Sequence, residues 1–124
     1  MSDGGREARS WRFYIQDMIE FSERVLAYTA GLDQDTFIAD QFTYDATLRN
    51  LELIGEAATH VPNEVRAAHP EIQWRRIIGT RNRVAHAYLG LDDDVIWDII
   101  RTDIPDLLPA LRNLLDTTTS EDSS

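Results

Sequence analysis

The chain has 124 residues, a length that favours one domain, and 43% of them are hydrophobic, enough for a single core. It contains no cysteine, which excludes disulfides and thiolate metal sites and fits a reducing compartment. No apolar run approaches the roughly 18–20 residues that cross a bilayer, and residues 1–10 lack the apolar stretch of a secretory signal. We therefore expect a cytoplasmic protein without membrane contact.

The formal net charge of −10 argues against binding nucleic acid by bulk electrostatic attraction. All twelve basic residues are nevertheless arginines, and four lie close together: Arg75, Arg76, Arg81 and Arg83. Genome base composition explains the lack of lysine most simply. Because arginine offers a planar fork to phosphates and carboxylates, the cluster is still the best candidate for one local positive site.

The polar ends of the chain, residues 1–10 and the acidic tail 117–124, are expected to be disordered, which leaves a domain at residues 11–116. Apolar positions predict a first helix over residues 11–30, followed by Gly31 as a C-terminal cap. A second long helix is expected from Thr36 or Asp40 to His60. Its apolar stripe at helical spacing comprises Tyr44, Leu48, Leu51, Gly55 and Ala58.

A short helix is expected at residues 62–68, between two prolines, and a third long helix from Gln73 to about Tyr88–Gly90. Residues 92–94 are three aspartates that would form the acidic start of a fourth helix, which Pro105 and Pro109 should kink or split. No segment shows the sustained alternation of apolar and polar residues that is typical of a strand. The sequence therefore predicts an all-α, up-and-down four-helix bundle with a short extra helix.

Arg81 is the unusual residue of the third helix. At about 100° per residue it lies in the middle of an apolar stripe. The other members of that stripe are Trp74, Ile77, Ile78, Ala85 and Tyr88. A guanidinium in such a place must meet a carboxylate, a partner subunit or an anionic ligand. Glu52 and Glu56 of the second helix are the possible carboxylate partners in a buried pair.

His86 lies about 120–140° around the same helix, near Arg75, Gly79 and Asn82. One straight helix therefore does not direct Arg81 and His86 at one point. Either the helix deforms towards Gly90 or a second subunit completes the site. Together the two side chains suit RNA cleavage without a metal. The histidine can move protons at neutral pH, the arginine can stabilise phosphate charge, and the RNA 2′-hydroxyl can be the nucleophile.

A metal site is the weaker alternative. Glu52, Glu56 and His60 lie at i, i+4 and i+8 on one face of the second helix. Di-iron bundles, however, need Glu-x-x-His motifs on two helices, and the chain has none. We expect these residues to form a polar stripe and expect neither metal nor cofactor.

Several blocks of the sequence together resemble the HepT family of the HEPN superfamily. They are LRNLELIGEA (48–57), PEIQWRRIIG (70–79), RNRVAHAYLGLD (81–92), VIW (95–97) and DIP (103–105). The resemblance covers residues 13–115, and the ordered blocks are far more specific than the short arginine–histidine motif. It implies a HEPN-type helical homodimer in which two copies of the motif meet in a cleft.

Proteins of this family are toxins of two-gene toxin–antitoxin modules, and many are metal-independent endoribonucleases. Their Arg-x4-His-x-Tyr signature corresponds to Arg81, His86 and Tyr88, and Asn82 matches the polar residue after the arginine. The resemblance thus implies that Arg81 and His86 are catalytic. We expect Asn82 and the cluster arginines 75, 76 and 83 to contact a tRNA or mRNA substrate.

The antitoxin of such type VII-like modules is a minimal nucleotidyltransferase of the MntA type. It transfers AMP to the motif tyrosine, which here would be Tyr88, and thereby blocks the cleft. The alternative is a catalytically inactive HEPN dimer that acts as a protein- or nucleotide-binding module.

Overall fold

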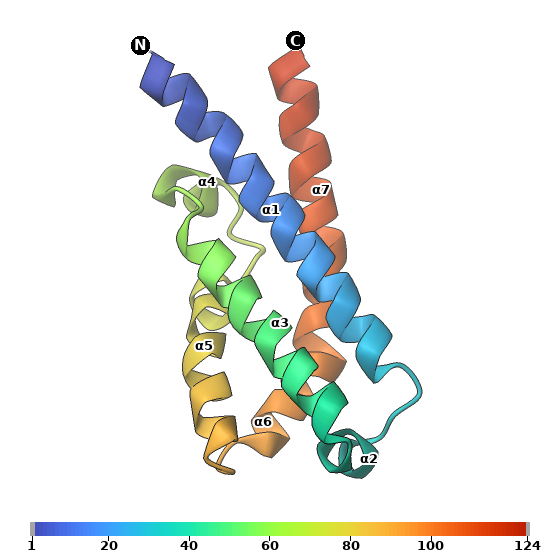
Figure 1. Ribbon diagram of the computed structural model, residues 1–124. Helices are drawn as coiled ribbons and strands as arrows, with labels where there is room; N and C mark the ends of the chain where they lie inside the picture. The colour runs from blue at the N-terminus through green and yellow to red at the C-terminus, as the bar shows by residue number, and fades with distance from the viewer. Residues whose placement is uncertain (1, 124) are drawn as a thin grey trace.

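The computed structural model in Figure 1 describes the backbone of residues 2–123 and the side chains of residues 11–117. Within these residues the chain is helical and has no strand, as predicted. Its elements are α1 (Ser2–Thr29), α2 (Gln34–Ala39), α3 (Gln41–Thr59), α4 (Asn63–Ala68), α5 (Trp74–Tyr88), α6 (Asp93–Asp98), the π-helix η1 (Ile99–Asp103) and α7 (Ile104–Ser123). α1 begins at Ser2, before the expected start near residue 11, and α7 continues to Ser123. The disorder expected for residues 1–10 and 117–124 stays a prediction.

The four long helices form the predicted up-and-down bundle, with α5, α3, α1 and α7 as successive neighbours (Figure 1). α1 and α5 run towards the end of the bundle where α2 and α6 lie, and α3 and α7 run back. α5, which carries the motif, is an outer helix that packs on α3 and contacts α6 at its end. In the described part of the chain, no helix is both long and apolar enough to cross a membrane.

Asp40 divides the expected second helix into α2 and α3, and Asp33 precedes the first of them. Asp33 caps α2 by accepting a 2.8 Å hydrogen bond from the backbone N–H of Thr36. Asp40 has an extended backbone (φ −91°, ψ 92°) that ends α2, and its side chain accepts a 3.2 Å bond from the Thr43 N–H at the start of α3. Both predicted starts, near Thr36 and at Asp40, therefore occur, as separate helices.

The expected fourth helix is split as predicted, at a π-helical turn before Pro105. Proline has no N–H, so the carbonyl of Arg101 cannot receive its α-helical hydrogen bond. The chain adapts by a wider turn, in which the Ile104 N–H bonds to the Ile99 carbonyl five residues earlier. Pro109 lies inside α7 without dividing it.

The predicted stripe of α3 is buried along its whole length. The stripe predicted for α5, by contrast, is wrong by about one position. The buried residues of α5 are Trp74, Ile77, Thr80, Val84 and Ala87. Arg81, Ala85 and Tyr88 are exposed beside them. Thr80 can be buried because its hydroxyl bonds to the Arg76 carbonyl at 3.2 Å. Residue type alone therefore misplaced the buried face.

Candidate functional site

Arg81 lies where α5 passes close to Gly55 of α3. A Cβ added to Gly55 would stand 2.9 Å from Arg81 Cγ and 3.0 Å from the Ile77 carbonyl oxygen, so glycine makes this approach possible. The guanidinium Nη1 donates a 2.7 Å hydrogen bond to Glu56 Oε2 on α3. Glu56 is one of the two partners expected from the sequence.

The sequence analysis considered a buried pair, but the Arg81 and Glu56 side chains are 41% and 52% exposed. Ion pairs this exposed contribute only about 0–1 kcal/mol to stability. The core therefore does not depend on the pair, and the guanidinium can exchange Glu56 for another anion at small cost.

The acidic stripe of α3 is engaged in ion pairs. Glu52 accepts a 2.9 Å bond from Arg49 Nη1, and Glu56 Oε1 lies 3.4 Å from His60 Nε2. Among the described side chains, no group of three or more His, Asp and Glu residues could hold a metal ion. The stripe thus supplies counter-charges to arginine side chains and a contact to His60.

His86 lies on another side of α5, next to the first turn of α6. Its Nδ1 is 3.0 Å from Asp92 Oδ2, and the two side chains are 53% and 17% exposed. Arg83 Nη1 lies 3.6 Å from the same carboxylate oxygen. α5 remains a regular helix to Tyr88, so Arg81 is held at α3 and His86 at α6. The angular spacing predicted that one straight helix would not direct Arg81 and His86 at one point. The structure agrees, since the two side chains of one chain face different helices.

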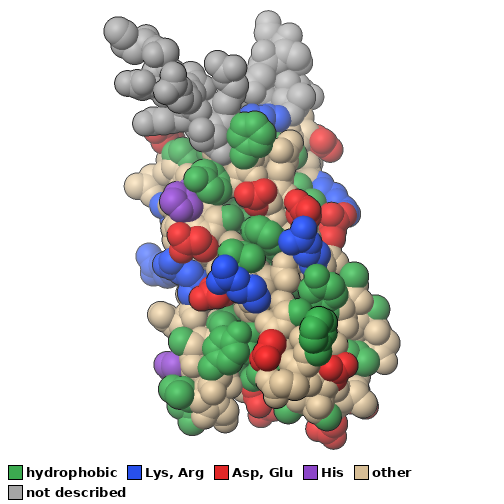
Figure 2. All heavy atoms as spheres, viewed as in Figure 1, with side chains coloured by type: hydrophobic (Ala, Val, Ile, Leu, Met, Phe, Trp, Pro, Cys, Tyr) green, Lys and Arg blue, Asp and Glu red, His purple; other side chains and the backbone are tan. Residues whose placement is uncertain are grey.

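Tyr88 ends α5 and is 56% exposed. Its pKa is raised above the ordinary value, first by partial burial and then by the negative charges of Asp45 and Glu52, while Arg49 opposes the shift. The same end of the bundle exposes further hydrophobic side chains, namely Phe42, Leu89 and Leu91. Figure 2 shows hydrophobic side chains at the surface of this end, below a band where arginine and acidic side chains meet.

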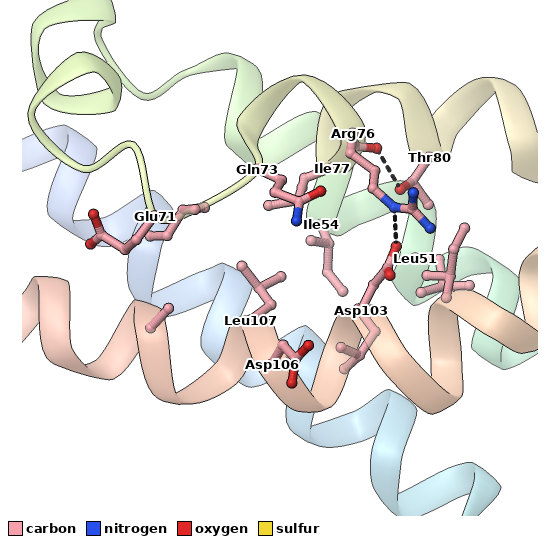
Figure 3. Close-up of a pocket in the computed structure, with 14 residues that line it drawn as sticks. Leu51, Ile54, Glu71, Gln73, Arg76, Ile77, Thr80, Asp103, Asp106 and Leu107 are labelled. Carbon is pink, nitrogen blue, oxygen red and sulfur yellow. Dashed lines mark hydrogen bonds and ion pairs between the residues drawn. The ribbon is translucent and has the colours of Figure 1, made fainter.

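The other arginines that were predicted to contact the substrate differ in their surroundings. Arg76 Nε donates a 2.6 Å bond to Asp103 Oδ2, which raises the Arg76 pKa, and Arg76 Nη2 lies 3.6 Å from Asp98. Figure 3 shows this pair beside a largely apolar cavity of about 80 Å³ between α3, α5 and α7. Arg75 has no ion-pair partner among the described side chains.

An open groove of about 490 Å³ lies between α5 and the α6–η1 segment. Arg75, Arg76 and Arg83 line it together with Gly79, and Asp94 and Asp98 lie on the opposite side. A Cβ at Gly79 would meet nothing within 4 Å, so the groove floor is open there. Asn82, the last of the predicted substrate contacts, is exposed.

Sequence analysis missed the role of Tyr44. This side chain is 8% exposed, and its hydroxyl donates to Asp93 Oδ1 at 2.5 Å and lies 3.2 Å from the Ala87 carbonyl oxygen. Burial and then the Asp93 carboxylate raise the Tyr44 pKa. The hydroxyl thus ties α3 to the turn that carries Tyr88 and Asp92. Tyr44 was expected in the buried stripe of the second helix, and a buried tyrosine hydroxyl needs a hydrogen-bond partner. That requirement could have indicated a contact of this kind.

Comparison with known proteins adds independent evidence. The family model described as "Ribonuclease HepT-like" matches residues 18–114. "Probable ribonuclease HepT" of Thermococcus cleftensis is 38% identical over 99 residues, which are 80% of this chain and 90% of the relative. A "Putative RNase" of Methanocaldococcus jannaschii is 32% identical over 97 residues, 78% and 89% of the two chains. No solved structure matches significantly.

Proposed function

Because the chain belongs to the HepT-like ribonuclease family, we propose that it is a metal-independent endoribonuclease and the toxin of a type VII-like toxin–antitoxin module. The observation that carries this proposal is the exposure of the motif. Arg81 and His86 are held at the surface by exposed or half-buried acids, and Tyr88 at the end of α5 is more than half exposed. All three groups are therefore accessible to an RNA strand or a modifying enzyme.

The chemistry needs no group beyond the two side chains and the RNA. The 2′-oxygen attacks the adjacent phosphorus, the P–O5′ bond breaks, and a 2′,3′-cyclic phosphate and a 5′-hydroxyl result. His86 accepts the 2′-hydroxyl proton and, as the imidazolium, passes it to the leaving O5′. Arg81 leaves Glu56 and binds the phosphate oxygens, whose charge increases in the transition state.

A homodimer follows from this scheme. Arg81 and His86 of one chain face different helices, so a second copy must supply the missing partner of each. The exposed hydrophobic side chains at the α2 and α6 end of the bundle give such a contact apolar surface to bury. Arg75, Arg83 and Asn82 are then placed to contact the strand of a tRNA or mRNA. Arg76 lines the same groove as Arg75 and Arg83, but its guanidinium is already bonded to Asp103.

Cleavage of tRNA in the presence of EDTA tests the activity. We expect His86→Ala and Arg81→Ala each to slow cleavage by about 100-fold or more, the usual size of such contributions. Arg24→Ala is the matched control, because Arg24 makes an equally exposed 2.8 Å pair with Glu20 on α1. If the wild type and both variants leave RNA equally intact, the proposal fails and a non-catalytic binding dimer takes its place.

The antitoxin is proposed to be a nucleotidyltransferase of the MntA type that modifies Tyr88. The Tyr88 oxygen would attack the α-phosphorus of ATP and displace pyrophosphate, which adds bulk and negative charge beside Arg81. A tyrosine phenol is protonated at neutral pH, and the surroundings of Tyr88 raise its pKa further, so the transferase must supply the base.

Intact-mass spectrometry after incubation with the cognate transferase and ATP tests this modification. We expect one AMP-sized increment in the wild type and in Tyr28→Phe, a control because Tyr28 is 42% exposed on α1. The increment should be absent from Tyr88→Phe. An increment that persists in Tyr88→Phe would show that the acceptor is another residue.

A further inference from the structure

The turn between α5 and α6 places a carboxylate on one ring nitrogen of His86. Asp92 Oδ2 lies 3.0 Å from Nδ1, and no described side chain bonds the other nitrogen, Nε2. The Asp92 side chain is only 17% exposed, whereas that of His86 is 53% exposed. The contact therefore has an anchored side, the acid, and an accessible side, the imidazole.

Asp92 occupies a position at which aspartate usually serves a different purpose. It is the N-cap residue of α6, but its side chain makes no capping hydrogen bond. Asp33 and Asp40, the N-cap residues of α2 and α3, both accept one. A capping bond commonly contributes about 1 kcal/mol, so the orientation of Asp92 towards His86 replaces a favourable local interaction.

The backbone of the turn between α5 and α6 fixes the distance between Asp92 and His86. Gly90 has a φ of +76°, which closes the turn after α5, and the Leu91 N–H bonds to the His86 carbonyl at 3.0 Å. On the far side, Tyr44 holds Asp93 at 2.5 Å. Asp92 thus lies between two anchored residues. Arg83, 3.6 Å away, is the charged group that balances it.

From this geometry we infer that Asp92 is a positioning residue for His86, an inference that rests on the proposed ribonuclease function. Asp92 accepts a hydrogen bond from the Nδ1–H group and so holds the neutral imidazole in the tautomer with a free lone pair on Nε2. Nε2 takes the proton of the RNA 2′-hydroxyl. Asp92 stays ionised throughout and stabilises the imidazolium that forms. Arg83, expected from the sequence to bind RNA, also supports this carboxylate.

Two variants of Asp92 test the inference by kinetics. Asp92→Asn keeps the shape but lacks the charge, and Asp92→Ser keeps a good N-cap residue for α6. We expect both to lower kcat by about 100-fold or more while KM for RNA changes by less than about threefold, because the acid acts on the proton transfer and not on binding. Asp35→Asn, which removes the same charge from an exposed site on α2, should match the wild type.

The tautomer gives a second readout that does not depend on activity. In ¹⁵N spectra at a pH where His86 is neutral, the wild type should carry the ring proton on Nδ1, and Asp92→Asn should shift it towards Nε2. A wild-type His86 protonated on Nε2, or Asp92 variants with wild-type kcat, would overturn the inference. Failure of the ribonuclease function would look different. His86→Ala would then cleave as the wild type does, while the tautomer would still report on Asp92.

Discussion

The acid that each arginine contacts determines what that arginine is free to do. Arg81 shares an exposed pair with Glu56, so it can move to a phosphate. Arg76 is bound at 2.6 Å to Asp103, whose side chain is only 22% exposed, and it joins α5 to η1. Arg75 is exposed without an ion-pair partner among the described side chains. Neighbours in sequence thus have different functions available to them.

Substitution of Arg75 and Arg76 should separate RNA binding from stability. In a His86→Ala background, Arg75→Gln should weaken RNA affinity and lower the salt slope of log Kd by about one, while folding stability is unchanged. Arg76→Gln should lower the free energy of unfolding by about 0.5–1 kcal/mol, with a smaller effect on RNA. Fluorescence anisotropy across a salt series and urea denaturation measure the two quantities. Equal losses of RNA affinity would contradict this division.

The partners of such residues could be predicted only in part. The position of Arg81 required a carboxylate, and Glu56 was one of two candidates on α3. In the structure Glu56 bonds to Arg81, and Glu52 bonds to Arg49 three residues before it on the same helix. Which of the two acids faces α5 depends on how the two helices cross, and one sequence does not give that crossing. Asp92 was predicted only as part of an acidic helix start. Three successive aspartates give no indication of which one turns back to His86.

At the scale of the elements, α3 and α5 are held close by a glycine opposite an arginine. The α3 stripe could be predicted because its small and large apolar residues all fall on one face. The buried face of α5 could not, because it includes Thr80 and Ala87 while the apolar Ala85 and Tyr88 stay exposed. The division of the fourth helix followed from Pro105, but the π-helical hydrogen bonding at that point did not.

Alanine substitutions at the two helical glycines near the motif should have opposite effects. Gly55→Ala places a Cβ 3.0 Å from the Ile77 carbonyl oxygen, so we expect a loss of about 1–2 kcal/mol from overpacking between α3 and α5. Gly79→Ala meets nothing within 4 Å, so its helix propensity should stabilise the protein by about 0.5–1 kcal/mol. Thermal and urea unfolding measure both. Stabilisation by Gly55→Ala would show that the helix crossing is not tight.

For the whole molecule, the net charge of −10 and a nucleic-acid substrate have to be reconciled. Long-range attraction cannot concentrate RNA on such a surface. Binding must instead come from a few arginines whose charge is presented locally, on the outer helix α5. Two copies of that helix would double the local positive charge in one cleft. We therefore expect the proposed dimer, rather than one chain, to be the unit that binds RNA.

A mixing experiment tests whether the site is shared between subunits. Arg81→Ala and His86→Ala are each inactive alone if both residues are catalytic. If a site combines Arg81 of one copy with His86 of the other, a heterodimer of the two variants holds one intact site and one doubly defective site. Random pairing then restores about a quarter of wild-type activity, since half of the dimers are mixed and each has one working site. The pairing is made by unfolding and refolding the variants together, and tRNA cleavage is the measurement. A site within one chain predicts no recovery, because each chain in the mixture lacks one of its two catalytic groups.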